Sequence, residues 1–293
     1  MVFVAAFDDR KKIPEYICHF LRHTIRYADI LFLTPANRGW RNASLESCVF
    51  LHPKKLPRFE NVVALFDLVF ANYSTNSLRF ERACFLRWFA LNAATSNLSD
   101  ADYVCLLDTD FILGVDPSVM LDRIHHEAGV DDGYFDFVSQ WSPDMNYVAP
   151  ELTIFKKKTL FEFCLFLLTE FFEVSHSSAL ISGYFNRIGR GCSGGVCDMT
   201  ALAAFLKARS LCAFNLRSEG ERLGRIVSNF NSFSAQMALD KKPWSIAWDG
   251  EQQLLLSDGQ QHPLFGVHFQ GSAKKHIQLF AAQRRAINSF DSY

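Results

Sequence analysis

The sequence predicts one α/β domain whose mixed, mainly parallel sheet is flanked by helices. Val2–Phe7 is a wholly apolar run, as is typical of a strand that is buried on both faces. A helical stretch follows from Pro14 to about Ala28, because proline is tolerated in the first turn of a helix. The runs Asp29–Thr34 and Cys48–His52 are again mainly apolar. This alternation of strand, helix and strand indicates parallel pairing.

The middle of the chain continues the pattern. Asn72–Ser77 is a polar loop, Arg79–Ala94 is a strong helix candidate, and Tyr103–Leu107 is a buried strand. Further expected elements are strands at Phe135–Trp141 and Val267–Phe269 and helices at Lys158–Glu173, Met199–Lys207 and Lys274–Arg285. No internal repeat or clear linker interrupts the chain, so one domain over residues 1–293 is the simplest organisation.

The composition is that of a globular protein and argues against one class of partner. A chain of 293 residues is long enough to bury a large hydrophobic core. Its formal net charge of -1 provides no basic surface for a nucleic acid. The 29 Phe residues are read mainly as core. The alternative, that part of them forms an apolar surface for a membrane or a lipid-linked substrate, stays open.

The cysteines and the apolar segments favour a cytoplasmic protein. The eight Cys lie mostly inside apolar runs, as buried free thiols do, and the start of the chain does not match a secretion signal. Cys192 and Cys197 form the one close pair, but no second pair completes a zinc site, so we interpret them as structural. Thr159–Phe172 is shorter than the ~20 apolar residues of a spanning helix. We expect a buried helix there, with peripheral contact at the inner membrane face as the alternative.

Two carboxylates follow the strand Tyr103–Leu107. Asp108 and Asp110 stand where ligands bind in parallel α/β sheets, outside the carboxyl end of a strand. Residues i and i+2 of an extended segment point to the same side, so the two carboxylates repel each other unless a cation lies between them. A hard divalent cation fits such oxygen ligands and still binds a diphosphate. An isolated Asp-x-Asp often only caps a turn, but the apolar strand and the preceding basic helix favour the metal site.

The wider pattern resembles the GT-A glycosyltransferases, most closely a bacterial group of predicted nucleotide-diphospho-sugar transferases. Four segments carry the resemblance in the expected order: Phe85–Phe89, Leu106–Asp110, Ser193–Thr200 and Val267–Lys274. An Asp-x-Asp followed more than a hundred residues later by His-Phe-x-Gly-x-x-Lys is much more specific than the triplet alone. The resemblance implies a GT-A-like domain with a Rossmann-like sheet. Residues 1–110 would form its nucleotide-binding half and residues 111–293 its sugar and acceptor half.

The resemblance also implies roles for individual residues. Asp108 would contact the donor ribose and the metal, while Asp110 and His268 would bind the metal, Mn²⁺ or Mg²⁺, directly; neutral imidazole suits manganese. Gly271 would let the backbone approach the diphosphate. Lys274 would stabilise the departing nucleoside diphosphate. Asp8, just after the first strand, would lie near the nucleobase of the donor.

A double glycine before an acidic helix start suggests a sugar pocket. Gly194 and Gly195 predict a tight turn that lets a sugar ring come close, and Asp198 opens the next helix. The resemblance places this segment at the sugar and acceptor pocket and so implies that Asp198 is the candidate catalytic residue: a general base in an inverting reaction, or a group that holds the sugar in a retaining one. A simple N-cap is the alternative.

Three arginines lie on one arc of the predicted helix Arg79–Ala94. Arg79 and Arg82 fit a solvated basic face, whereas apolar residues surround Arg87 on both sides. A partly buried arginine needs an anionic partner, which here is Asp108 or the donor diphosphate. We therefore expect Arg87 to be the donor-binding arginine.

The sequence favours a glycosyltransferase that uses a nucleotide-diphosphate sugar and a glycan, lipid-linked or protein acceptor, in polysaccharide biosynthesis. Two alternatives stay open. One is a non-catalytic nucleotide-sugar-binding protein, because a fold does not fix a function. The other is a nucleotidyltransferase, which is less favoured because Phe7–Lys12 lacks the glycine-rich loop of that class.

Overall fold

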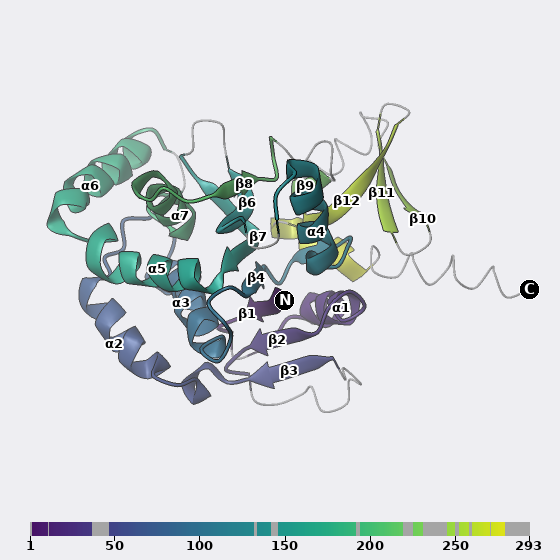
Figure 1. The fold of residues 1–293 in the computed structure, drawn as a ribbon. Helices are drawn as coiled ribbons and strands as arrows, with labels where there is room; N and C mark the ends of the chain where they lie inside the picture. The colour runs from purple at the N-terminus through teal and green to yellow at the C-terminus, as the bar shows by residue number, and fades with distance from the viewer. Residues whose placement is uncertain are drawn as a thin grey trace, which may run out of the picture.

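The computed structural model describes residues 2–10, 12–36, 47–131, 134–141, 146–191, 194–218, 225–230, 245–249, 252–257, 260–269 and 271–278. Within this part of the chain, helices and strands build two sheets and the layers that cover them (Figure 1).

The central sheet has seven strands in the order β3-β2-β1-β4-β7-β6-β8. Their bounds are β1 Val2–Phe7, β2 Ile30–Leu33, β3 Cys48–Leu51, β4 Tyr103–Leu107, β6 Phe137–Trp141, β7 Val148–Lys156 and β8 Ala213–Asn215. The first four strands are mutually parallel, as the sequence predicts, whereas β7 runs antiparallel to both β4 and β6. The predicted mixed, mainly parallel α/β sheet is therefore confirmed.

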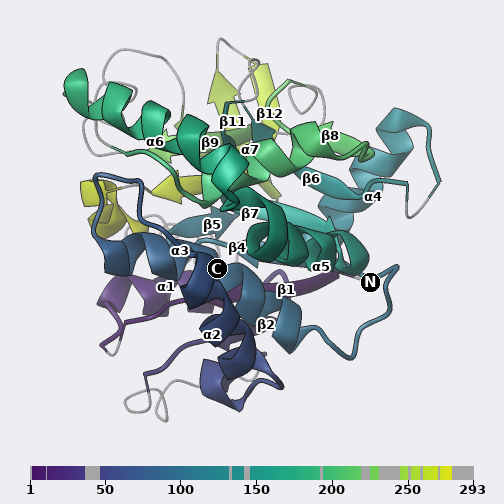
Figure 2. The same ribbon diagram turned by 90° about the vertical axis from the view of Figure 1, so that its left-hand side faces the viewer.

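Helices cover both faces of the central sheet, because its strands are apolar on both sides. One face packs against α1 (Glu15–Thr24) and α4 (Pro117–Ala128). The other packs against α2 (Phe59–Val69), α3 (Leu78–Ala94), α5 (Lys157–Phe166) and α7 (Asp198–Ala208). In Figure 2, α2, α5 and the protruding α6 (Val174–Gly189) follow one another along one side of the molecule. Much of the Phe surplus lies in the second core, so the core reading of these residues holds.

A smaller sheet adjoins the first where the chain leaves β4. Its strands are β5 (Phe111–Leu113), β9 (Arg225–Phe230), β10 (Ser245–Asp249), β11 (Gln252–Ser257) and β12 (Gln260–Phe269). The order is β10-β11-β12-β5, and β9 also pairs with β12. Since β5 follows β4 after only three residues, the Asp108–Asp110 segment joins the two sheets.

Several predicted elements need correction. The segment expected as one apolar helix, Lys158–Glu173, forms two elements: α5 ends at Phe166, and a π-helical turn, Leu167–Phe171, follows it. Lys274 belongs to a 3₁₀ helix, Gly271–His276, and the remainder of the expected last helix from residue 279 lies outside the described residues. The glycines between Gly189 and Gly195 predict a flexible loop, but Gly189 is still the last residue of α6. No helix among the described residues is long and apolar enough to cross a membrane.

Candidate functional site

The two aspartates lie at the junction of the two sheets. Asp108 directly follows β4, and its backbone N–H donates to the carbonyl of Glu151 on β7 at 3.0 Å. Asp110 directly precedes β5, where its carbonyl accepts from the N–H of Phe269 at 2.9 Å. Both residues are therefore fixed through their backbones to neighbouring strands. Their position at the carboxyl end of β4 is the one that the sequence predicts.

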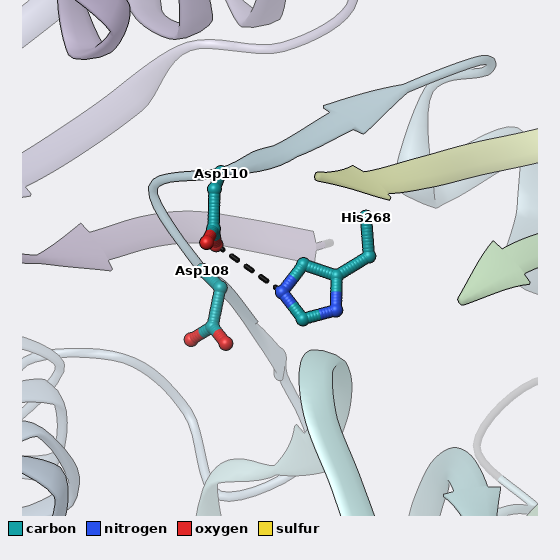
Figure 3. A group of neighbouring side chains, drawn as sticks. All are labelled: Asp108, Asp110 and His268. Carbon is teal, nitrogen blue, oxygen red and sulfur yellow. Dashed lines mark ion pairs between the residues drawn. The ribbon is translucent and has the colours of Figure 1, made fainter. Parts of the chain in front are cut away.

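Strand pairing brings His268 to the same place from far along the chain. β12 runs antiparallel to β5, and His268 pairs with Phe111, the residue after Asp110. The two strands approach closely at Gly266, where an added Cβ would lie 2.3 Å from the Phe111 ring. The imidazole then faces the Asp110 carboxylate, with Nε2 3.3 Å from Oδ1 (Figure 3).

Asp108, Asp110 and His268 form a set of ligand atoms that fits a divalent cation. One atom from each residue lies within 4.8 Å of the other two, close enough for a single ion between them. Two carboxylate oxygens and one imidazole nitrogen are a donor set that suits Mn²⁺, whereas Mg²⁺ prefers oxygen ligands throughout. In Figure 3 the Asp110 carboxylate and the His268 ring point toward each other, and the Asp108 carboxylate lies on the same side of the ring as Asp110.

Two neighbouring side chains, His268 and Lys274, lower the pKa of Asp110. Lys274 Nζ lies 2.7 Å from Asp110 Oδ2, on the side away from His268. Burial alone would raise the pKa of Asp110, but the hydrogen bond and charge of His268, together with Lys274, lower it. Burial alone would lower the pKa of His268, and Asp110 raises it instead. Asp110 is therefore a carboxylate that is ready to bind a cation.

Lys274 is reached through a turn that only glycine adopts easily. Gly271 opens the short helix with a φ of 58°, and an added Cβ there would meet nothing within 4 Å. The backbone at Gly271 thus borders open space, which is compatible with the predicted approach of a diphosphate. Lys274 itself also lies over the ring of Tyr16, 5.4 Å from its centroid.

Arg87 on α3 joins two carboxylates that are distant in sequence. Its Nη1 is paired with Asp108, and its Nη2 is paired with Asp198. Burial opposes the charge of Arg87, but the two carboxylates raise its pKa, so the guanidinium stays charged. The sequence predicted Asp108 as a partner of Arg87 and missed Asp198. Arg79 and Arg82 pair instead with Asp9 and Asp67 and are the more exposed residues expected.

Asp198 is buried at the first residue of α7 and is not the N-cap. Cys197 caps the helix, so the capping alternative for Asp198 is wrong. The Asp198 Oδ2 accepts from Nε of Arg87 at 3.0 Å and from the indole N–H of Trp88 at 3.0 Å, as well as from Arg87 Nη2. The residue therefore links α7 to α3 directly beside Asp108. Trp88 stands next to Arg87 in the quoted motif, yet nothing in the sequence pattern indicated that its N–H binds Asp198.

The structure requires a glycine at position 195 for a reason that the sequence did not reveal. Its φ is 151°, and an added Cβ would lie 2.4 Å from the carbonyl oxygen of Tyr73. The backbone of Tyr73 and Ser74 thus occupies the space beside Gly195 where the sequence predicts the close approach of a sugar ring. At Gly194, where φ is 89°, an added Cβ would lie 3.4 Å from the Arg187 side chain. A contact of either glycine with the donor stays a prediction.

Asp8 lies at the carboxyl end of β1, beside β4, and is already bound by a neighbour. Its carboxylate accepts from the backbone N–H of Arg10 at 2.8 Å and from Nε of the same residue at 2.9 Å. Arg10 also donates to the Tyr16 hydroxyl at 2.9 Å. Arg10 and Tyr16 were not predicted, although an arginine two residues after an aspartate at a strand end is a signal for such a pair. They stand between Asp8 and Lys274, on the same edge of the sheet.

Comparison with known proteins places this fold. Neither a protein-family model nor a curated protein matches the sequence significantly. Among solved structures, mouse xyloside xylosyltransferase 1 in its apo form superposes with a TM-score of 0.52 at 7% identity, over 92% of this chain and 97% of that one. The galactosyltransferase LgtC, in complex with donor and acceptor sugar analogues, has a TM-score of 0.47 at 12% identity, over 97% and 96%. At these identities the first similarity establishes the fold alone: the chain has the GT-A fold.

Proposed function

We propose that this protein is a metal-dependent glycosyltransferase that moves a sugar from a nucleotide-diphosphate donor to a hydroxyl group of a glycan or lipid-linked acceptor. The observation that carries the proposal is the convergence of Asp108, Asp110 and His268 at the carboxyl edge of a GT-A sheet. Ligand binding at this edge is general in α/β folds. We further propose Mn²⁺ as the cation, because one of the three ligands is an imidazole.

In this proposal, the metal set and the residues next to it bind the diphosphate end of the donor. A cation held by Asp108, Asp110 and His268 would neutralise the donor diphosphate and the charge that it gains as it leaves. Lys274 lies 2.7 Å from Asp110 and would bind a phosphate oxygen on the same side. Gly271, which has no side chain, would let the protein backbone contact the diphosphate. These residues bind the leaving group rather than the sugar.

Arg87 and Asp198 would form the sugar side of the site. Arg87 connects them to the metal set through Asp108. Because Asp198 Oδ2 already accepts from Arg87 and Trp88, this oxygen is better suited to hold a group than to remove a proton. We therefore favour sugar binding for Asp198 over the role of general base. Asp8 would lie toward the nucleobase, with Arg10 as its neighbour.

A screen of nucleotide sugars tests this function against its alternatives. Hydrolysis of UDP-glucose, UDP-galactose, UDP-N-acetylglucosamine, GDP-mannose and CMP- or dTDP-linked sugars would be followed with Mn²⁺, with Mg²⁺ and with a strong chelator. We expect cation-dependent release of the nucleotide from one donor class. Nucleotide-sugar binding without turnover in the screen or with added glycoside acceptors would indicate a binding protein. Pyrophosphate release from a nucleoside triphosphate with a sugar phosphate would indicate a nucleotidyltransferase.

A further inference from the structure

A second buried acid lies on α3 beyond the residues of the proposed site. Glu81 is 1% exposed and precedes Arg87 by six residues, about 9 Å along a helix axis. Because β4 follows α3 and is parallel to β1, α3 begins at the carboxyl edge of the sheet. The ion pair between Arg79 and Asp9, which follows β1, places the first turn of α3 at this edge. Glu81 therefore lies between this first turn and Arg87, the residue of α3 that pairs with Asp108.

Glu81 fastens the preceding loop to the helix. The Ser74 hydroxyl donates to Glu81 Oε1 at 2.7 Å, and the Asn76 amide donates to the same oxygen at 2.7 Å. The backbone N–H of Asn76 also donates to the Ser74 hydroxyl at 3.2 Å. The loop between α2 and α3 is thus held from inside by one carboxylate oxygen.

The same loop is paired with the segment that leads to Asp198. Ser74 and Gly195 form an antiparallel bridge. On either side, the N–H of Val196 donates to the carbonyl of Tyr73 at 2.8 Å, and the N–H of Thr75 donates to the carbonyl of Gly194 at 3.1 Å. We call this arrangement the latch: Glu81, residues 73–76, and residues 194–196. The latch fixes the segment that leads into α7, and hence the position of Asp198.

The second oxygen of Glu81 takes no part in the hydrogen bonds of the latch. Oε2 is buried and has no hydrogen-bond partner among the described residues. Burial raises the pKa of Glu81, and the hydrogen bonds from Ser74 and Asn76 only partly oppose this effect. An unsatisfied buried carboxylate oxygen costs free energy, whereas an amide at this position would add a donor and carry no charge. The latch therefore depends on Oε1 alone, and a glutamine, which keeps one acceptor oxygen, should preserve it.

The position of the latch relative to the metal set indicates which substrate it serves. The metal set binds the diphosphate end of the donor in the proposed function, and Arg87 with Asp198 follows on the sugar side. Glu81 comes next, close enough for the charge of Asp198 to raise its pKa. An acceptor has to reach the sugar carbon that carries the diphosphate, so it must be held on this side. The exposed Thr75 and Asn76 belong to this part of the latch, where the Thr75 hydroxyl is bonded to the backbone of Gly194 and the Asn76 amide donates to Glu81.

We propose that the latch forms the acceptor-side wall of the site and that Glu81 is its positioning residue. This inference rests on the proposed function for the identity of the substrate, but the latch itself is a property of the fold. Loss of the Glu81 contacts would release residues 73–76 and 194–196 together. The acceptor would then be misplaced, while the metal and the nucleotide stay bound.

Hydrogen–deuterium exchange tests the latch without any activity. Glu81→Ala should speed amide exchange in peptides that cover both residues 73–76 and 194–196, whereas Glu81→Gln, which keeps an acceptor oxygen, should not. Asn76→Ala removes one partly buried hydrogen bond to Glu81 and provides a milder variant if Glu81→Ala does not fold. Arg82→Ala is the matched control, because Arg82 is the next residue on α3 and pairs with Asp67 at the surface. Unchanged exchange in both peptides of Glu81→Ala and Asn76→Ala would overturn the latch.

Kinetics with octyl β-glycosides as acceptors tests the role in transfer. With the donor that the wild-type protein hydrolyses, Glu81→Ala and Asn76→Ala should lower kcat/KM for the acceptor. We expect a loss of roughly ten- to a hundredfold for Glu81→Ala, as for a misplacement of about 1 Å. Nucleoside diphosphate affinity and donor hydrolysis should match those of Arg82→Ala, and Glu81→Gln should restore transfer. Equal losses of nucleotide affinity and transfer, or a wild-type rate of transfer in Glu81→Ala, would contradict the acceptor role. A wild-type protein that hydrolyses no donor would instead contradict the proposed function, and the exchange experiment would still decide the latch.

Discussion

Replacement of Arg87 by methionine tests the network that connects the metal set to α7. Met has a helix propensity close to that of Arg, so the change removes the charge and the hydrogen bonds without weakening α3 itself. The Arg87 side chain is only 12% exposed, and that of Asp198 is 3% exposed. Removal of one partner from a buried ion pair leaves an unpaired buried charge, which costs about 3–5 kcal/mol. For a chain of this size, that loss lowers Tm by roughly 5–8 °C.

The loss should depend on pH. Burial already raises the pKa of Asp198, and Arg87 opposes this effect. Without Arg87 the folded-state pKa of Asp198 rises further above its unfolded value. A carboxyl group whose folded pKa is raised stabilises the fold at low pH, and this contribution is lost as the pH rises. The difference in stability between the wild-type protein and Arg87→Met should therefore be largest near pH 8 and shrink toward pH 5.

Thermal and urea unfolding of both proteins at pH 5.5 and pH 8 measure these effects. Arg82→Met is the control: it lies on the same helix and removes an exposed ion pair with Asp67, which contributes at most about 1 kcal/mol. If Arg87→Met lost no more stability than Arg82→Met, or lost more at low pH than at high pH, the bridging role of Arg87 would be refuted.

Three further substitutions probe separate parts of the site. Lys274→Ala should lower kcat by roughly ten- to a thousandfold, because a cation beside the leaving diphosphate stabilises the transition state more than the ground state. Unchanged turnover and unchanged affinity for the nucleoside diphosphate would place Lys274 outside the site. Asp198→Asn should leave nucleoside diphosphate affinity within about threefold and reduce product formation by roughly a hundredfold, as expected when a group that positions the sugar is disturbed. Normal transfer would reduce Asp198 to a structural link. Gly195→Ala should destabilise the fold by about 1–3 kcal/mol in urea unfolding, because φ is 151° and Tyr73 leaves no room for a Cβ. The control Gly183→Ala in α6, where an added Cβ would meet no described residue within 4 Å, should be neutral or stabilising. Equal effects of the two substitutions would contradict the close approach of Gly195 to Tyr73.

The parts of the site that follow a single strand were predictable from the sequence. Asp108 and Asp110 end a strand whose bounds, Tyr103–Leu107, agree with the structure, because apolar runs and strand-end carboxylates are local signals. His268 was reached only through the resemblance to GT-A enzymes. Its approach to Asp110 depends on the antiparallel pairing of β12 with β5, and no local pattern encodes that pairing. The resemblance therefore supplied what periodicity could not.

Contacts between helices could not be predicted in the same way. The sequence singled out Arg87 because apolar residues surround it, and that burial is confirmed. Its second partner, Asp198, depends on how α3 and α7 pack against one sheet face, which is set by tertiary structure. The N-cap of α7 was misassigned for a related reason: Asp is a common cap, but the Cys197 side chain and Thr200 complete the cap one residue earlier. The smaller sheet was also missed, apart from part of β12, because its short strands carry weak patterns.

Titration of nucleoside diphosphates into the protein tests the central claim most directly. UDP, GDP and CDP would be titrated by calorimetry with Mn²⁺ and with a strong chelator, into the wild-type protein, Asp110→Asn and the control Arg82→Ala. If Asp108, Asp110 and His268 hold the cation that binds the diphosphate, one nucleotide should bind the wild-type protein and Arg82→Ala only with Mn²⁺. Asp110→Asn should keep its fold, as judged by circular dichroism, and lose this binding. Tight binding in the presence of the chelator, or undiminished Mn²⁺-dependent binding to Asp110→Asn, would contradict the account.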